Sequence, residues 1–174
     1  DHVEAELVSE RGGVAPGAAF TVALRLKMVE HWHTYWKNPG DSGLPTKIKW
    51  SLPAGFEAGA IQWPYPKRLP TGPLTNFGYE GEVLLLTDLK APAQVKPGEQ
   101  VTLNARADWL VCKDVCIPEH ADLSLALPVA SGAPPLDAKW QTQFAAARAA
   151  LPQALTSFDV TVAQTDGTLE LRLM

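Results

Sequence analysis

The only two cysteines of the chain, Cys112 and Cys116, lie four positions apart. Two cysteines at this spacing can be joined across a tight chain reversal, and a disulfide that opens and closes carries two electrons. A structural staple is the alternative, but closing a loop of about five residues removes only roughly 2 kcal/mol of chain entropy. A chain of 174 residues can also bury a core without such a staple. The pair is therefore a candidate redox site, with an inert disulfide or two buried thiols as the other interpretations.

Charged side chains near the pair leave its reactive sulfur undecided. Lys113 and His120 would stabilise a thiolate, because a nearby positive charge favours the ionised sulfur. Four acidic residues would oppose it: Asp108, Asp114, Glu119 and Asp122. We therefore expect a dithiol that is only weakly activated alone and that reacts mainly when it is docked to a partner.

A group of candidate metal ligands precedes the cysteines in the sequence. On a strand, His31 and His33 would point to one face, because side chains alternate with a period of two. Together with Met28 and the cysteines they would offer the soft ligands that suit copper(I). An aromatic-lined surface is the simpler interpretation of the same residues. The sequence therefore predicts no bound metal and no cofactor, and a copper(I)-binding domain stays as an alternative.

Composition and charge exclude several functional classes. The chain has 15 Lys and Arg against 19 Asp and Glu, for a net charge of -4, whereas a nucleic-acid binder shows a basic patch. Apolar runs fall far short of the roughly 18 residues that a membrane-spanning helix needs. The chain begins at Asp1 without an apolar leader and ends at Met174 within an apparent strand. We expect a processed N-terminus and a piece of a longer protein.

Alternating apolar and polar residues predict the short strands that would position the cysteines. These strands cover 3–8, 20–28, 47–52, 79–89 and 100–109, and a last pair around 110–111 and 122–127 brackets the cysteines. Four prolines between 61 and 73 favour an edge strand or a loop there. Roughly seven or eight strands with frequent turn signals indicate an all-β fold, an immunoglobulin-like antiparallel β-sandwich.

The pattern changes near residue 131. Residues 131–135 are typical of a linker, and apolar residues then recur at helical spacing over 137–151, with Asp137 as the expected N-cap. We expect this helix to be a spacer that packs through Trp140 and Phe144.

Alternation returns from Phe158 to Met174, with a hairpin turn at Asp166-Gly167. The sequence thus predicts three parts: an immunoglobulin-like domain with the cysteine pair at 1–130, a linker and helix at 131–155, and the opening hairpin of a second, truncated β domain at 156–174.

Three segments together resemble a known family. They are WLVCKDVCIPE at 109–119, HWHTYWKNPGDSG at 31–43 and NFGYEGEV at 76–83. The chain resembles the N-terminal periplasmic domain of the DsbD-type transmembrane thiol:disulfide reductases over about residues 1–130. It is most similar to the ScsB (suppressor of copper sensitivity) branch, whose members place a second immunoglobulin-like domain after the first.

The resemblance implies a protein-disulfide reductase domain of an inner-membrane protein, located in the bacterial periplasm. Its electron donor would be the thioredoxin-like domain of the same full-length protein. The acceptors would be oxidised periplasmic proteins of thioredoxin-fold or isomerase-like type. We expect no nucleic-acid partner, and the membrane would be reached only through parts of the protein outside this chain. By position in the motif, Cys116 would form the mixed disulfides and Cys112 would resolve them.

The resemblance also implies the surroundings of the pair. In well-known members an aromatic ring on a cap loop covers the disulfide, and Phe77 or Tyr79 would be that ring here. Tyr35 and His33 fall where the family lines the site with aromatic side chains, and Trp109 is the tryptophan expected nearest to the disulfide. A binding module with an inert disulfide is the competing hypothesis. The cap with its Gly78 hinge favours the redox module, because a binding module needs no shielded and accessible pair.

Overall fold

The computed structural model of this chain describes residues 1–154 and 159–173. Phe158 and Met174, the expected limits of the last alternating segment, lie outside the described residues, as do residues 155–157. Among the described residues, no helix is long and apolar enough to cross a membrane.

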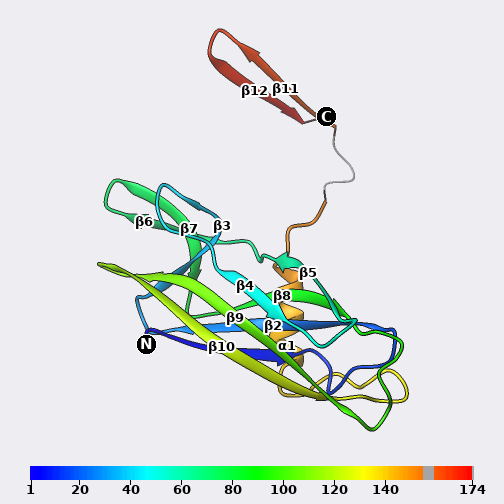
Figure 1. The fold of residues 1–174 in the computed structure, drawn as a ribbon. Coiled ribbons are helices and arrows are strands. Elements are labelled where there is room, and N and C mark those ends of the chain that lie inside the picture. Colours follow the sequence, from blue (N-terminus) through cyan, green and yellow to red (C-terminus); the bar gives the residue numbers. More distant parts are fainter. Residues whose placement is uncertain (155–158, 174) are drawn as a thin grey trace.

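Two antiparallel sheets pack face to face and form the body of the molecule (Figure 1). The first has the strand order β1 (Val3–Ser9), β2 (Ala19–Met28), β8 (Glu82–Lys90), β5 (Glu57–Gln62). The second has the order β10 (Cys116–Pro128), β9 (Gln100–Cys112), β3 (His33–Gly40), β7 (Leu74–Glu80), β6 (Lys67–Thr71), and β4 (Lys47–Ser51) also pairs with β9. The predicted all-β, immunoglobulin-like sandwich is confirmed.

The core lies between the sheets because the inward side chains of both are apolar. Near the cysteines, Leu24 and Leu26 of β2 pack with Trp109 and Val111 of β9. At the opposite end of the strands, Val22 of β2 belongs to a second cluster. The alternation that predicted β2 thus identifies the side of the strand that faces the other sheet.

One predicted strand is in fact two strands. The sequence predicted a single strand over 79–89, but Gly81 adopts a φ of 72° and separates β7 from β8. β7 belongs to the second sheet and β8 to the first, so the chain crosses between the layers at this glycine. A left-handed conformation of this kind is accessible to glycine at little cost.

The proline-rich segment supplies edge strands, as predicted. β5 lies at the edge of the first sheet and β6 at the edge of the second. Pro70 is part of β6, where it pairs with Thr75 of β7. An edge strand tolerates proline because the missing N–H can face away from the neighbouring strand.

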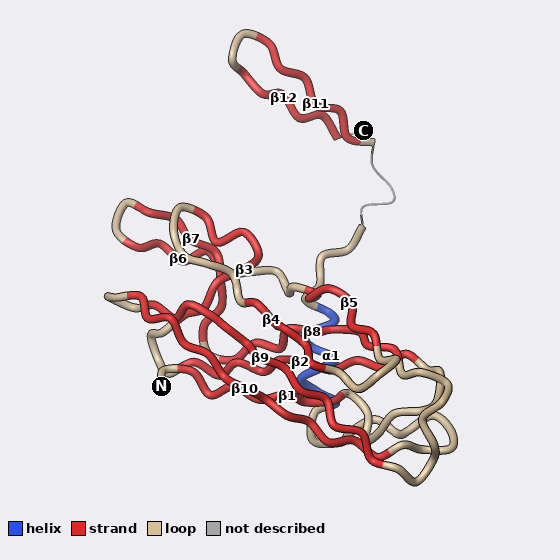
Figure 2. Tube along the Cα trace, in the orientation of Figure 1, coloured by secondary structure: helices blue, strands red, loops and turns tan. Residues whose placement is uncertain are grey.

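The helix α1 (Gln141–Ala149) is shorter than the predicted 137–151. Trp140 occupies the N-cap position, and the expected cap Asp137 instead opens the preceding turn: its carbonyl accepts hydrogen bonds from the N–H groups of Trp140 and Gln141. The later start of the helix follows from a backbone hydrogen bond: the N–H of Asp137 donates to the carbonyl of Glu10, which holds Asp137 at the end of β1. Figure 2 shows this helix beside the strands of the first sheet.

The helix covers the outer face of the first sheet. Trp140 and Phe144 are buried, as expected, and pack with Ala147 against side chains of β1, β2 and β8: Val8, Ala23, Leu84 and Leu86. β2 is therefore buried on both faces, one against the second sheet and one against the helix.

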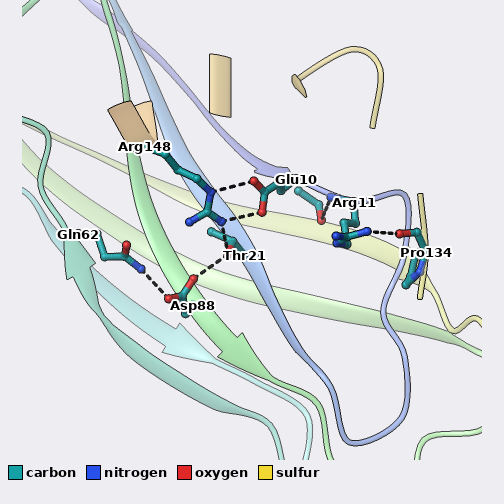
Figure 3. Close-up of polar contacts among 8 residues, drawn as sticks. Glu10, Arg11, Thr21, Gln62, Asp88, Pro134 and Arg148 are labelled. Carbon is teal, nitrogen blue, oxygen red and sulfur yellow. Dashed lines mark hydrogen bonds and ion pairs between the residues drawn. The ribbon is translucent and has the colours of Figure 1, made fainter. Parts of the chain in front are cut away.

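Polar contacts fasten the helix to the same sheet (Figure 3). The guanidinium of Arg148 donates to both carboxylate oxygens of Glu10, at 2.9 and 2.7 Å, and to the hydroxyl of Thr21 at 2.9 Å. Thr21 in turn donates to Asp88, which also accepts from Gln62. These bonds link α1 to β2, β8 and β5, so the helix is attached to the first domain by both apolar and polar contacts.

A separate hairpin follows the helix. β11 (Val160–Thr165) pairs with β12 (Thr168–Leu173) in a two-stranded sheet. Asp166 and Gly167 both have positive φ, 49° and 78°, which is typical of the predicted two-residue hairpin turn. That the hairpin opens a second β domain, and that domains divide at 130 and 155, stay predictions.

Candidate functional site

The disulfide closes the tip of a long hairpin. β9 and β10 pair residue by residue from Gln100 and Pro128 to Cys112 and Cys116. Residues 113–115 complete the reversal, in which Lys113 N–H donates to the Val115 carbonyl at 3.1 Å. The two cysteines are directly opposite in this register, with Cα atoms 4.1 Å apart, and they are joined as a disulfide. The spacing of the cysteines thus places them at the last paired position before the turn.

The two sulfurs differ in accessibility. Cys112 is only 2% exposed, whereas Cys116 is an exposed residue. The difference follows from the neighbours of the two strands: β9 is flanked by β3, while β10 is the edge strand of the sheet. Of the two cysteines, Cys116 is therefore the one that an incoming thiol or disulfide meets at the surface.

Two aromatic side chains of β3 line the disulfide. His33 pairs in register with Cys112, and the hydroxyl of Tyr35 lies 3.8 Å from Sγ of Cys116. The Nε2 atom of His33 lies 3.3 Å from the same hydroxyl, and the two rings meet edge to face with centroids 5.2 Å apart. The structure therefore brings together four of the predicted site residues.

Burial sets the charge state of this aromatic pair. Tyr35 is 2% exposed and His33 is 8% exposed. Burial raises the pKa of the Tyr35 hydroxyl, and a hydrogen bond with Ser42 acts in the opposite sense. Burial lowers the pKa of His33, partly offset by the carboxylate of Glu80. Near neutral pH the site therefore holds a neutral phenol beside a neutral imidazole.

The loop after β3 holds Tyr35 in position. Gly43 has a φ of 94°, and a Cβ atom there would collide with the Tyr35 ring. The buried side chain of Asn76 accepts hydrogen bonds from the backbone N–H and the hydroxyl of Ser42, at 3.0 and 3.1 Å. Ser42, Gly43 and Asn76 were not among the predicted site residues, although all three lie in the segments 31–43 and 76–83 that resemble the family.

The predicted covering ring is not supplied by Tyr79. This side chain is buried in the core between the sheets, and its hydroxyl donates to the carbonyl of Pro64 at 2.7 Å. Alternation on β7 explains the result, because Gly78 is the residue that pairs with Tyr35 and its neighbours point to the other side. Phe77 shares the side of β7 occupied by Tyr79 and is half-buried. Shielding of the disulfide by Phe77 stays a prediction.

Trp109 also lies on the other side of the sheet. It is buried in the core with Val111, whereas Cys112, three positions after Trp109, belongs to the outer face with His33. An odd separation along a strand reverses the face, so closeness in sequence to the disulfide did not make Trp109 part of its lining.

The expectation of a shared histidine face is wrong. His31 precedes β3 in a turn with a φ of 69°, and its side chain is 70% exposed. His33 begins the strand and points toward the disulfide. Within residues 1–154 and 159–173, no group of three or more His, Cys, Asp or Glu side chains is arranged to hold a metal ion.

A shallow apolar pocket lies on the same hairpin. It has a volume of about 340 Å³ and is lined by the β3–β4 connection, β4, β9 and β10. Apolar residues such as Leu44, Pro45, Leu110 and Pro118 alternate there with the charged Lys47, Asp108 and Glu119. Leu44 is largely exposed, as is Val115 at the hairpin tip.

Comparison with known proteins agrees with this geometry. The family described as the N-terminal domain of the thiol:disulfide interchange protein DsbD matches residues 4–128. The chain belongs to this family. The predicted family resemblance is confirmed, and the matched residues include both cysteines, β2 to β10 and all of β1 except Val3.

A solved structure extends the likeness beyond the family match. The N-terminal periplasmic domain of ScsB from Proteus mirabilis superposes with a TM-score of 0.68 at 22% sequence identity, over 99% of this chain. This chain spans 64% of that one. The likeness concerns the fold. No curated protein matches the sequence.

Proposed function

We propose that this chain is a thiol–disulfide exchange module that reduces oxidised protein partners through the Cys112–Cys116 pair. The observation that carries the proposal is the unequal exposure of two joined cysteines at a hairpin tip, Cys116 exposed and Cys112 buried. Membership of the DsbD N-terminal domain family supports it. A disulfide that served stability alone would not need an accessible sulfur lined by a histidine and a tyrosine.

The exchange proceeds in two balanced steps. In the reduced protein, the Cys116 thiolate attacks a disulfide of the partner, which forms a mixed disulfide and releases one partner sulfur as a thiolate. The Cys112 thiolate then attacks Sγ of Cys116 and releases the second partner sulfur. The products are the Cys112–Cys116 disulfide and two partner thiolates. These take up the two protons that the Cys112 and Cys116 thiols released on ionising, so two electrons and two protons have moved in total.

The surrounding system is part of the proposal. The reductant that restores the two thiols is a thioredoxin-like domain of the same full-length protein, and the acceptors are periplasmic proteins of thioredoxin-fold or isomerase-like type. The chain is then a periplasmic domain of an inner-membrane protein, with β11 and β12 opening a second β domain. The Proteus mirabilis ScsB structure, itself described as a periplasmic domain, supports this location.

The equilibrium reduction potential of the pair tests the proposal. Incubation in a glutathione or dithiothreitol series, followed by trapping of free thiols, measures the fraction of reduced protein at each ratio. We expect a potential between those of thioredoxin and the oxidising periplasmic catalysts, roughly -270 to -120 mV. A potential well below about -300 mV would identify a bond that resists reduction, and the inert binding module would then be the better description.

A further inference from the structure

The side chains beside Cys116 form an unbroken chain of groups that can carry a proton. The Cys116 sulfur contacts the Tyr35 hydroxyl at 3.8 Å, and that hydroxyl contacts Nε2 of His33 at 3.3 Å. His33 and Tyr35 are both buried, so the far end of the chain is shielded from solvent. A partner seated on Cys116 would also exclude water from the sulfur itself. Under those conditions the thiol proton needs an acceptor inside the protein.

We propose that Tyr35 is a catalytic residue that relays the proton of the Cys116 thiol to His33 while Cys116 becomes the attacking thiolate. This inference rests on the proposed exchange function and specifies how its nucleophile is formed. Tyr35 touches the reacting sulfur, whereas His33 acts only through Tyr35 and is a positioning residue.

The hydrogen-bond directions satisfy both states of the relay. With Cys116 as a thiol, its S–H donates to the Tyr35 oxygen, and the Tyr35 O–H donates to the unprotonated Nε2 of His33. When the proton moves, the Tyr35 oxygen gains one proton and passes its own to His33. Nε2–H then donates to the Tyr35 oxygen, and the Tyr35 O–H donates to the thiolate. One proton has been transferred, and every polar atom keeps a partner.

The groups around His33 allow it to accept this proton. Burial lowers its pKa, so the imidazole is neutral and available near neutral pH. The carboxylate of Glu80, directly across on β7, favours the imidazolium once it forms. Lys67 of β6 forms an ion pair with Glu80 at 3.5 Å and so weakens the effect of this carboxylate. On its other side, His33 lies opposite Cys112 of β9. The charges that face His33 thus favour reversible protonation.

The relay is tested by the pH dependence of Cys116 reactivity in a Cys112→Ser background, where one sulfur remains. The probe is iodoacetamide, and the readout is the alkylation rate across the pH range. With the relay intact we expect two inflections, because a thiolate–imidazolium pair persists below the pKa of the thiol alone. Tyr35→Phe and His33→Gln should each leave a single inflection at higher pH. A rise of one unit in the thiol pKa slows the reaction at pH 7 by roughly threefold, since the thiolate fraction falls more than its nucleophilicity rises.

Matched controls separate the relay from a general loss of structure. Tyr65→Phe removes an exposed phenolic hydroxyl, and His31→Gln removes an exposed imidazole two positions from His33. Both should keep the two-inflection profile. The Tyr35→Phe, His33→Gln double variant should be no slower than either single variant, because the two residues act as one unit.

The outcomes distinguish this inference from the proposed function. Single variants that retain both inflections, or a double variant whose effects multiply, would overturn the relay. The reduction potential of the unmodified protein is measured separately and tests the exchange function. A normal potential with unchanged variant profiles rejects only the relay, whereas a pair that cannot be reduced removes the function on which the relay rests.

Discussion

His33 of β3 and Cys112 of β9 lie directly opposite each other in the second sheet. Earlier in β9, over residues 104–108, the neighbouring strand is β4 instead of β3. The disulfide therefore lies where β9 changes its partner strand, beside the beginning of β3. This change places His33 and Tyr35 against the cysteine pair while the edge strand β10 leaves Cys116 open.

Unequal exposure predicts unequal reactivity of the two sulfurs. Cys112→Ser leaves the exposed Cys116, which should form a stable mixed disulfide with oxidised glutathione. Cys116→Ser leaves the buried Cys112, which should react more slowly by on the order of tenfold, because reaction requires access as well as a thiolate. Mass spectrometry of the quenched adduct measures both rates. Equal rates would contradict the assignment of Cys116 as the sulfur that meets the partner.

Gly43 should be indispensable to the position of Tyr35. Gly43→Ala combines a positive φ with a collision against the Tyr35 ring, whereas Gly98→Ala has a similar φ of 89° and open space around its Cβ. We expect Gly98→Ala to cost about 1 kcal/mol of unfolding free energy and Gly43→Ala about 1–3 kcal/mol more. Denaturant unfolding measures both. In a Cys112→Ser background, where the Cys116 thiol is free, only Gly43→Ala should also alter Cys116 alkylation, and unchanged alkylation would argue against this packing.

The helix should contribute strongly to the stability of the first domain. Phe144 of α1 is 1% exposed and packs against the first sheet. Phe144→Ala should therefore lower the unfolding free energy by about 3–5 kcal/mol. Thr142→Ala changes an exposed position of the same helix and should stay within about 0.5 kcal/mol of the parent. Both are compared by urea unfolding. A small loss for Phe144→Ala would mean that α1 is only loosely attached.

Protonation of His33 should lower the free energy of unfolding in acid. Burial lowers its pKa in the folded protein below the usual 6.5, an effect that Glu80 partly offsets. The folded state then binds this proton less readily than the unfolded state, so the contribution is present above about pH 6.5 and is lost as the pH falls through the folded pKa. Besides Glu80, the neighbouring groups are Lys67, Cys112 and Tyr35.

Unfolding free energies at about pH 7.5 and about pH 5 measure this dependence. His33→Gln should show a smaller decrease between the two pH values than the parent, because glutamine has no proton to gain. The exposed His31→Gln variant should keep the full decrease. If His33→Gln loses as much stability as the parent, protonation of His33 does not drive the acid effect.

Local patterns in the sequence determined the strands, the edge prolines and the cysteine hairpin. Each of these features depends on residues close together in the chain. β2 follows from alternating apolar and polar residues, the edge position of β6 from the missing N–H of Pro70, and the hairpin from the chain reversal between Cys112 and Cys116. The placement of His33 and Tyr35 beside the cysteines came from the family resemblance, and the structure agrees with it.

Only the tertiary structure decided which faces became the site and which became the core. Because side chains alternate along a strand, the sequence shows that Trp109 and Cys112 point to opposite sides of β9. Which of these sides is buried depends on the packing of the two sheets against each other. Gly81 directs the chain into the other layer and leaves Tyr79 in the core, and α1 buries the outer face of β2. These outcomes depend on contacts between residues far apart in the chain, and the free energy of burying apolar surface is gained only when those contacts form.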